Sequence, residues 1–166
     1  MILTRLKTFL AAIAIISFVA VARAQDFSFT TSTGETVTVS SMRGKVVVLL
    51  FSGVQDPQRR EGLRVLASLA DRFQGKDVKV CWVSVNSPSE MSNDQLKAIG
   101  GGSVVVLRDV NQAAFKRYSG KLAQLPTIVV FDRQGNPFGQ PRGGFNPNSD
   151  FINDLASTID NLLQRK

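Results

Sequence analysis

The sequence predicts a three-layer α/β domain, and three observations indicate this class. Apolar runs of strand length alternate with segments whose apolar residues recur at helical spacing. Two runs, Val46–Phe51 and Val78–Val85, are almost continuously apolar, as expected for central strands that helices cover on both faces. The chain then closes with two strands joined by a turn and with an amphipathic helix.

Turn and cap residues divide the chain into its expected elements. Gly75 follows the first helix, at a position where glycine commonly ends helices. Ser89 or Ser92 can cap the second helix, and Asn148 or Ser149 can cap the last. In order, the expected elements are a β-hairpin over 27–30 and 36–39, a connector over 40–45, a strand over 46–51, a helix over 57–74, a strand over 78–85, a helix over 87–100, a strand over 104–107, a helix over 111–118, strands over 126–132 and 138–142, and a helix that ends near 163.

The junction after the first central strand is the most informative stretch of the chain. Asp56 is a favoured N-cap residue, and Pro57 suits the first position of a helix. The Asp56 side chain can accept from the N–H group of Gln58 or Arg59, and Arg59 can pair with it as a cation. These contacts predict a capped, ion-paired helix start. A carboxylate that acts as acid, base or ligand is the alternative interpretation.

The first residues have the pattern of a secretory signal peptide. Arg5 and Lys7 form a basic region, an apolar segment follows, and Ala22-Arg23-Ala24 resembles a cleavage site. We therefore expect residues 1–24 to be removed and residues 25–166 to form one domain, exported to the periplasm or the exterior. An uncleaved membrane anchor is the alternative, but the apolar segment is shorter than the roughly 20 residues that a spanning helix needs.

The content of cysteine, histidine and charge excludes several classes of site. Cys81 is the only cysteine, and the chain has no histidine, so an intramolecular disulfide, a histidine-dependent catalytic site and histidine-ligated metal are all excluded. We expect no cofactor. The formal net charge of +7 is spread without a long basic run, so neither nucleic-acid binding nor stable membrane insertion after cleavage is expected. Cys81 lies within an apolar strand, where a lone cysteine usually packs as a small buried hydrophobe.

Several strings of this sequence resemble the secreted TlpA/ResA-type thiol-disulfide oxidoreductases, a family with a thioredoxin-like fold. The resemblance covers about residues 27–163. Its most specific part is Leu125-Pro126-Thr127, which precedes a strand and an Asp-x-x-Gly turn; the Met42-Arg43-Gly44-Lys45 string before a strand also matches. The resemblance implies a cis peptide bond before Pro126. It also implies that the backbone of Leu125 pairs with a bound substrate beside the active-site turn.

The sequence departs from the family at the active-site turn itself. Where the family has Phe-Trp-Ala-x-Trp-Cys-x-x-Cys, this chain has Ser52 and Gln55 at the tryptophan positions. Asp56 stands at the position of the attacking cysteine and Arg59 at that of the resolving one. Peroxiredoxins, which share the fold, also need a cysteine at the start of this helix.

The sequence therefore favours an exported binding or accessory protein without dithiol chemistry, whose partner is an exported protein or an extended peptide. Its predicted groove comprises Ser52, Gln55, Asp56, Leu125 and Pro126. The alternative is a thiol-disulfide oxidoreductase or a peroxiredoxin-like antioxidant that uses Cys81 alone, which would require an accessible thiol. The basic residues around Arg59 are expected to form a solvated face, or else an anion-binding patch.

Overall fold

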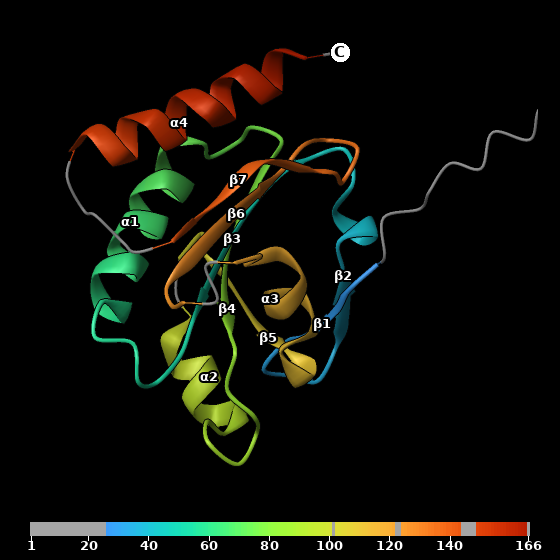
Figure 1. Cartoon of the computed structure of the whole chain (residues 1–166), viewed down its shortest axis with the longest axis vertical. Coiled ribbons are helices and arrows are strands. Elements are labelled where there is room, and N and C mark those ends of the chain that lie inside the picture. Colours follow the sequence, from blue (N-terminus) through green and yellow to red (C-terminus); the bar gives the residue numbers. More distant parts are fainter. Residues whose placement is uncertain (1–25, 101, 122–123, 144–148, 166) are drawn as a thin grey trace, which may run out of the picture.

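A seven-stranded mixed sheet with strand order β2-β1-β5-β4-β3-β6-β7 forms the centre of the molecule (Figure 1). The structure, a computed structural model, describes residues 26–100, 102–121, 124–143 and 149–165. The strands are β1 (Ser28–Thr30), β2 (Thr36–Thr38), β3 (Val46–Ser52), β4 (Val78–Ser84), β5 (Val105–Asp109), β6 (Thr127–Phe131) and β7 (Pro137–Gly143). The helices are η1 (Ser40–Met42), α1 (Arg59–Arg72), α2 (Asn93–Ile99), η2 (Val110–Gln112), α3 (Ala113–Tyr118) and α4 (Ser149–Gln164).

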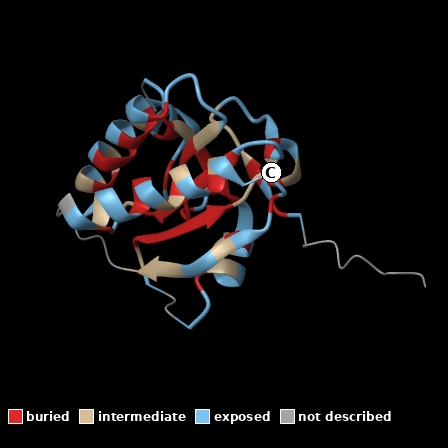
Figure 2. Cartoon of the chain, turned by 90° about the horizontal axis from the view of Figure 1, so that it is seen from above, coloured by how far each residue is buried: buried red, intermediate tan, exposed pale blue. Residues whose placement is uncertain are grey.

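Alternate residues of β3 point into two separate apolar cores. On one face, Val48 and Leu50 pack with buried residues of α1, α2 and α4. On the other, Leu49 and Phe51 pack with α3 and with the N-terminal hairpin. Figure 2 shows the buried strands between helices whose outer faces are exposed. Successive side chains of β3 point to opposite faces of the sheet, and all of them are buried, so other elements must cover both faces. The predicted three-layer α/β class is therefore confirmed.

The strand directions bring one end of several strands to a common edge of the sheet. β3, β4 and β5 are parallel, so their carboxyl ends, which include Ser52, Ser84 and Asp109, lie at that edge. β6 runs antiparallel to β3, and Thr127 pairs with Phe51. The start of β6 therefore lies at the same edge as the end of β3.

The boundaries of three helices differ from those predicted. α1 begins at Arg59 rather than Pro57, because the chain first makes turns in which the N–H of Asp56 bonds to the carbonyl of Gly53 and that of Arg59 to the carbonyl of Asp56. α2 begins only at Asn93, where Ser92 makes the capping box.

The helix predicted over 111–118 is interrupted by left-handed backbone. Asn111 and Gln112 have φ values of 58° and 56°, so a short η2 precedes α3, and α3 itself begins at Ala113. Asparagine tolerates this conformation better than most residues with a side chain. The strand before it is also longer than predicted, since β5 includes Arg108 and Asp109.

Parts of the chain lie outside the described residues. The predicted signal peptide, residues 1–24, is among them, and so is the candidate cap Asn148. Within the described ranges, no helix combines the length and the apolar character that crossing a membrane requires.

Cys81 lies in the middle of the sheet, as predicted. It pairs with Leu49 of β3 and Val105 of β5, and its side chain has no solvent exposure. Burial raises the pKa of the Cys81 thiol to about 12, because the apolar surroundings disfavour the thiolate. The thiol is therefore protonated and inaccessible at neutral pH, and the requirement of the mono-thiol hypothesis is not met.

We predict that an aromatic disulfide reagent labels Cys81 slowly in the native protein at pH 8 and immediately in denaturant. Both the burial and the raised pKa of the thiol oppose reaction, since the thiolate is the nucleophile. Absorbance of the released thiolate follows the reaction. Fast labelling of folded protein, with unchanged circular dichroism, would contradict the buried placement.

Candidate functional site

The candidate site is built around the Asp56 carboxylate, between the end of β3 and the start of α1. The Ser52 hydroxyl donates to Asp56 Oδ2 at 2.7 Å, and the Gln58 N–H donates to Asp56 Oδ1 at 2.9 Å. Ser52 has no solvent exposure and Asp56 has 8%. Both carboxylate oxygens are thus engaged by neutral donors, and the predicted contact with Gln58 is confirmed. The predicted cap is wrong, because Gln58 rather than Asp56 is the N-cap residue of α1 and it has no side-chain cap hydrogen bond.

Asn86, which follows β4, supports the same turn from the neighbouring strand. The Val54 N–H donates to Asn86 Oδ1 at 2.8 Å. A side chain at Gly53 would place its Cβ 2.9 Å from that oxygen, which is closer than real contacts allow. Glycine at position 53 is therefore required for the turn to approach Asn86.

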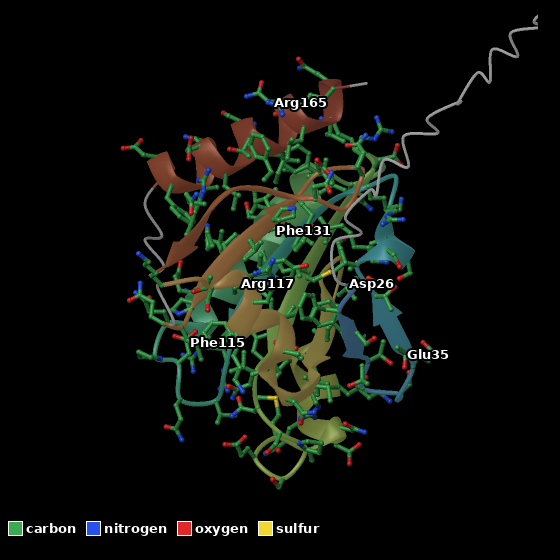
Figure 3. The ribbon with its side chains drawn as sticks, turned by 45° about the vertical axis from the view of Figure 1, so that its right-hand side comes forward. Asp26, Glu35, Phe115, Arg117, Phe131 and Arg165 are labelled. Carbon is green, nitrogen blue, oxygen red and sulfur yellow. The ribbon has the colours of Figure 1, made fainter. Side chains whose placement is uncertain are left out.

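Leu125 and Pro126 lie beside the turn, and the peptide bond between them is cis. Since Phe51 pairs with Thr127 in antiparallel register, Ser52 and Pro126 are next to each other across the β3–β6 ladder. Pro126 is buried, and Leu125 is half-buried and packs on the core that contains Phe51. Phe115 of α3 meets the Phe51 ring at 5.8 Å between centroids, and Figure 3 shows Phe115 and Arg117 on α3.

The other residues predicted for the site, Ser52, Gln55 and Arg59, differ in their exposure and in their contacts. Gln55 is exposed on the turn, whereas Ser52 is fully buried and bonds to the buried Asp56, so Ser52 does not line an open surface. Arg59 is half-buried, and no ion pair joins it to Asp56 among the described residues, so the expected pairing is wrong. Both carboxylate oxygens of Asp56 instead accept from the Ser52 hydroxyl and the N–H of Gln58.

The surface in front of the turn is hollowed and carries charged residues of both signs. Asp56, Pro57, Arg59, Arg60 and Glu61 line a depression of about 470 Å³. Glu61 pairs with Arg64 at 3.3 Å, which leaves Arg59 and Arg60 as the cations beside the depression.

The turn itself carries no thiol, because Asp56 and Arg59 stand where the resemblance would place cysteines. The only thiol, Cys81, lies three residues before the end of β4, about 10 Å from the edge at the rise of a strand. The carboxylate at position 56 accepts hydrogen bonds but cannot form a disulfide with a substrate.

Three polar residues at this edge were not predicted to be functional: Asn86, Arg108 and Asp109. All three are buried, although each follows or ends an apolar strand. Asp109 accepts from the N–H groups of Ala114 and Phe115 at 3.1 and 2.7 Å, so it holds the start of α3, and burial raises the pKa of its carboxyl. The sequence could have pointed to these residues, because polar side chains at the carboxyl ends of adjacent parallel strands commonly mark a site.

Solved structures of low sequence identity share this fold. The exposed lipoprotein thioredoxin Etrx1 of Streptococcus pneumoniae is 22% identical, with a TM-score of 0.65, and the match covers 81% of this chain and 99% of that one. A protein from Chlorobium tepidum, provisionally described as the thiol:disulfide interchange protein DsbE, is 22% identical, with a TM-score of 0.68 and coverage of 84% and 94%. A provisionally described protein disulfide isomerase from Bacteroides thetaiotaomicron is 24% identical, with a TM-score of 0.68 and coverage of 86% and 88%. At these identities the likeness establishes a thioredoxin-like fold.

Among curated proteins, no significant match exists. The model of the AhpC/TSA family, in contrast, matches residues 21–136, which is more than half of the chain and includes β1 to β6 and the Asp56 turn. The resemblance that the sequence suggested is confirmed at the level of this family and this fold. The chain belongs to the AhpC/TSA family and has a thioredoxin-like domain.

Proposed function

We propose that this protein is an exported, redox-inactive binding protein that holds an extended peptide segment of its partner beside Leu125. The observation that carries the proposal is the Asp56 carboxylate, which occupies the family's attacking-cysteine position and is held there by Ser52 and Gln58. The resemblance places a reactive cysteine at this position, whereas here a carboxylate is held in the turn by two hydrogen bonds.

The side chains beside the turn support this proposed groove. Leu125 is half-exposed next to the turn, and Gln55 is exposed on the turn itself. Amide and backbone groups there can pair with an extended chain, and the apolar Leu125 side chain can pack on it. The cations of Arg59 and Arg60 favour a partner segment that carries an acidic residue near the start of α1.

Export is supported by the signal-peptide pattern of residues 1–24 and by the kind of protein that shares the fold. Etrx1 of Streptococcus pneumoniae is described as an exposed lipoprotein. An extracytoplasmic partner is therefore the expected one.

We predict that residues 25–166 do not accelerate the reduction of insulin by dithiothreitol, because no dithiol is present and Cys81 is buried. Turbidity of the precipitating insulin chain measures the reaction against a heat-denatured sample. Catalysis that survives Cys81→Ser would refute the proposal.

The matched positive control is the double variant Asp56→Cys, Arg59→Cys. It restores the two sulfurs at the start of α1, where the helix N-terminus stabilises a thiolate. We expect weak activity, since Ser52 and Gln55 still replace the tryptophans of the related oxidoreductases. Activity in this variant, with none in the parent, assigns the difference to the substituted pair.

We predict that Leu125→Arg abolishes capture of the native partner from a cell-envelope extract while changing the melting temperature by only a few degrees. Leu125 is half-buried at the surface of its core, so the arginine head can reach water, yet it obstructs the groove. Quantitative mass spectrometry compares the proteins captured by wild type and variant.

Leu163→Arg is the matched control, because Leu163 is a half-buried leucine on α4 that packs on the other core. It is expected to retain the partner. Equal capture by wild type and Leu125→Arg would contradict the groove and would direct attention to the basic face around Arg60.

A further inference from the structure

A cavity of about 790 Å³ lies at the same edge of the sheet, around the end of β5. Its volume is within the range typical of small-molecule sites. The β1–β2 hairpin, the loop after β4 and the η2–α3 segment form its walls, and β1 pairs with the end of β5 (Figure 1). None of the residues predicted for the peptide groove lines this cavity, so its ligand is independent of the proposed peptide.

The charged groups of the cavity balance one another, and contacts inside the protein already engage them. Arg108, which is 3% exposed, donates to two backbone carbonyls at 2.8 and 2.7 Å. The Asp109 carboxylate accepts from backbone N–H groups of α3 and interacts electrostatically with Lys116. Glu90 accepts from the N–H and the hydroxyl of Ser87. A ligand charge of either sign would therefore meet repulsion as well as attraction, so the lining favours a neutral ligand.

Amide and hydroxyl side chains make up most of the remaining lining. Gln112 Nε2 donates to the carbonyl of Val85 at 3.1 Å, and Asn93 Oδ1 accepts from Arg108 at 3.3 Å. These bonds hold one end of each amide. Within the described ranges the other end, an acceptor on Gln112 and donors on Asn93, has no hydrogen-bond partner, and neither has the side-chain amide of the exposed Asn111. Neutral donors and acceptors are thus available to a ligand.

The wall that carries these amides is held in a defined shape. Gln112 and Arg108 bond to the carbonyls of two consecutive residues, Val85 and Asn86, so their head groups lie close together. Asn111 and Gln112 have left-handed backbone, with φ values of 58° and 56°. Residues other than glycine rarely adopt this conformation, and where the surrounding structure maintains it, a ligand site is often nearby.

Apolar surface completes the cavity. Val110 is 42% exposed, the only exposed large hydrophobic residue in the described part of the chain, and the neighbouring lining includes Pro88. A sugar combines hydroxyl groups, each of which donates and accepts, with apolar C–H faces. A compact ring also suits walls from three segments better than an extended peptide, which pairs with a free strand edge. We propose that this cavity binds a neutral sugar, with its hydroxyl groups on the side-chain amides of the wall and a C–H face on Val110.

The test titrates the ¹⁵N-labelled mature protein with glucose, galactose, mannose and N-acetylglucosamine. At least one of them is expected to shift the side-chain amide resonances of Asn93, Asn111 and Gln112 with millimolar affinity. The amino and uronic acid derivatives of that sugar, which add a positive and a negative charge to the ring, are expected to bind no more tightly. A blocked dipeptide, N-acetyl-alanyl-alanine amide, is expected to cause no shift.

The absence of shifts with all four neutral sugars would overturn the proposal. Tighter binding of a charged derivative would overturn it as well, because the cavity would then recognise an ion. Equal binding of the blocked dipeptide would assign the cavity to peptides instead.

Asn111→Asp replaces the amide donors at an exposed position and is expected to weaken binding about fivefold, as for one lost hydrogen bond. Asn153→Asp is the matched control, because Asn153 is an exposed asparagine of α4 that does not line the cavity. Val110→Ser removes the apolar contact and is also expected to weaken binding. Backbone spectra confirm that each variant is folded, and affinities equal to that of Asn153→Asp in both cavity variants would refute the site.

Discussion

The hydrogen bond from Ser52 to Asp56 joins the end of the central strand to the start of the first helix inside the protein. The same carboxylate binds the N–H of Gln58, so one side chain fixes the turn at both ends. Asn86 holds the middle of that turn through Val54. Without the carboxylate, a buried hydroxyl and a helix-start N–H would lose their acceptor, and each such loss costs about 1–3 kcal/mol.

This constraint shows how a thioredoxin-like fold can hold the turn before α1 without a cysteine there. A helix N-terminus favours a negative group at this position, whether it is a thiolate or a carboxylate. The thiolate can attack a disulfide, whereas the carboxylate only accepts hydrogen bonds. A carboxylate at this turn therefore supports the proposed loss of electron exchange. The neighbouring Leu125–Pro126 segment lies beside Ser52 through the β3–β6 ladder.

Structural features that depend on the local sequence pattern were predicted correctly. The alternation of β3 between two cores follows from its continuous apolar run, and the burial of Cys81 follows from its place within β4. The Asp56 contact with Gln58 was also predictable, because the two residues are neighbours in the chain.

Contacts between distant segments were not predictable in this way. Val54 and Asn86 are 32 residues apart, and Arg108 and Asn86 are 22 residues apart, so only the folded sheet brings them together. The start of α1 was misplaced because Asp56 and Pro57 also suit a turn, and the hydrogen bonds of that turn delay the helix to Arg59. The left-handed pair Asn111 and Gln112 likewise has no strong local signal, since glutamine rarely adopts that backbone.

The most direct test of the central claim is a double-mutant cycle between Ser52→Ala and Asp56→Ala, measured by denaturant unfolding. If the two side chains act as one structural unit, their effects are strongly non-additive, and the coupling free energy is about 1 kcal/mol or more. The double variant should then be scarcely less stable than Asp56→Ala alone. Additive effects, with a coupling near zero, would contradict the account, because Asp56 would then be held at the helix start independently of Ser52.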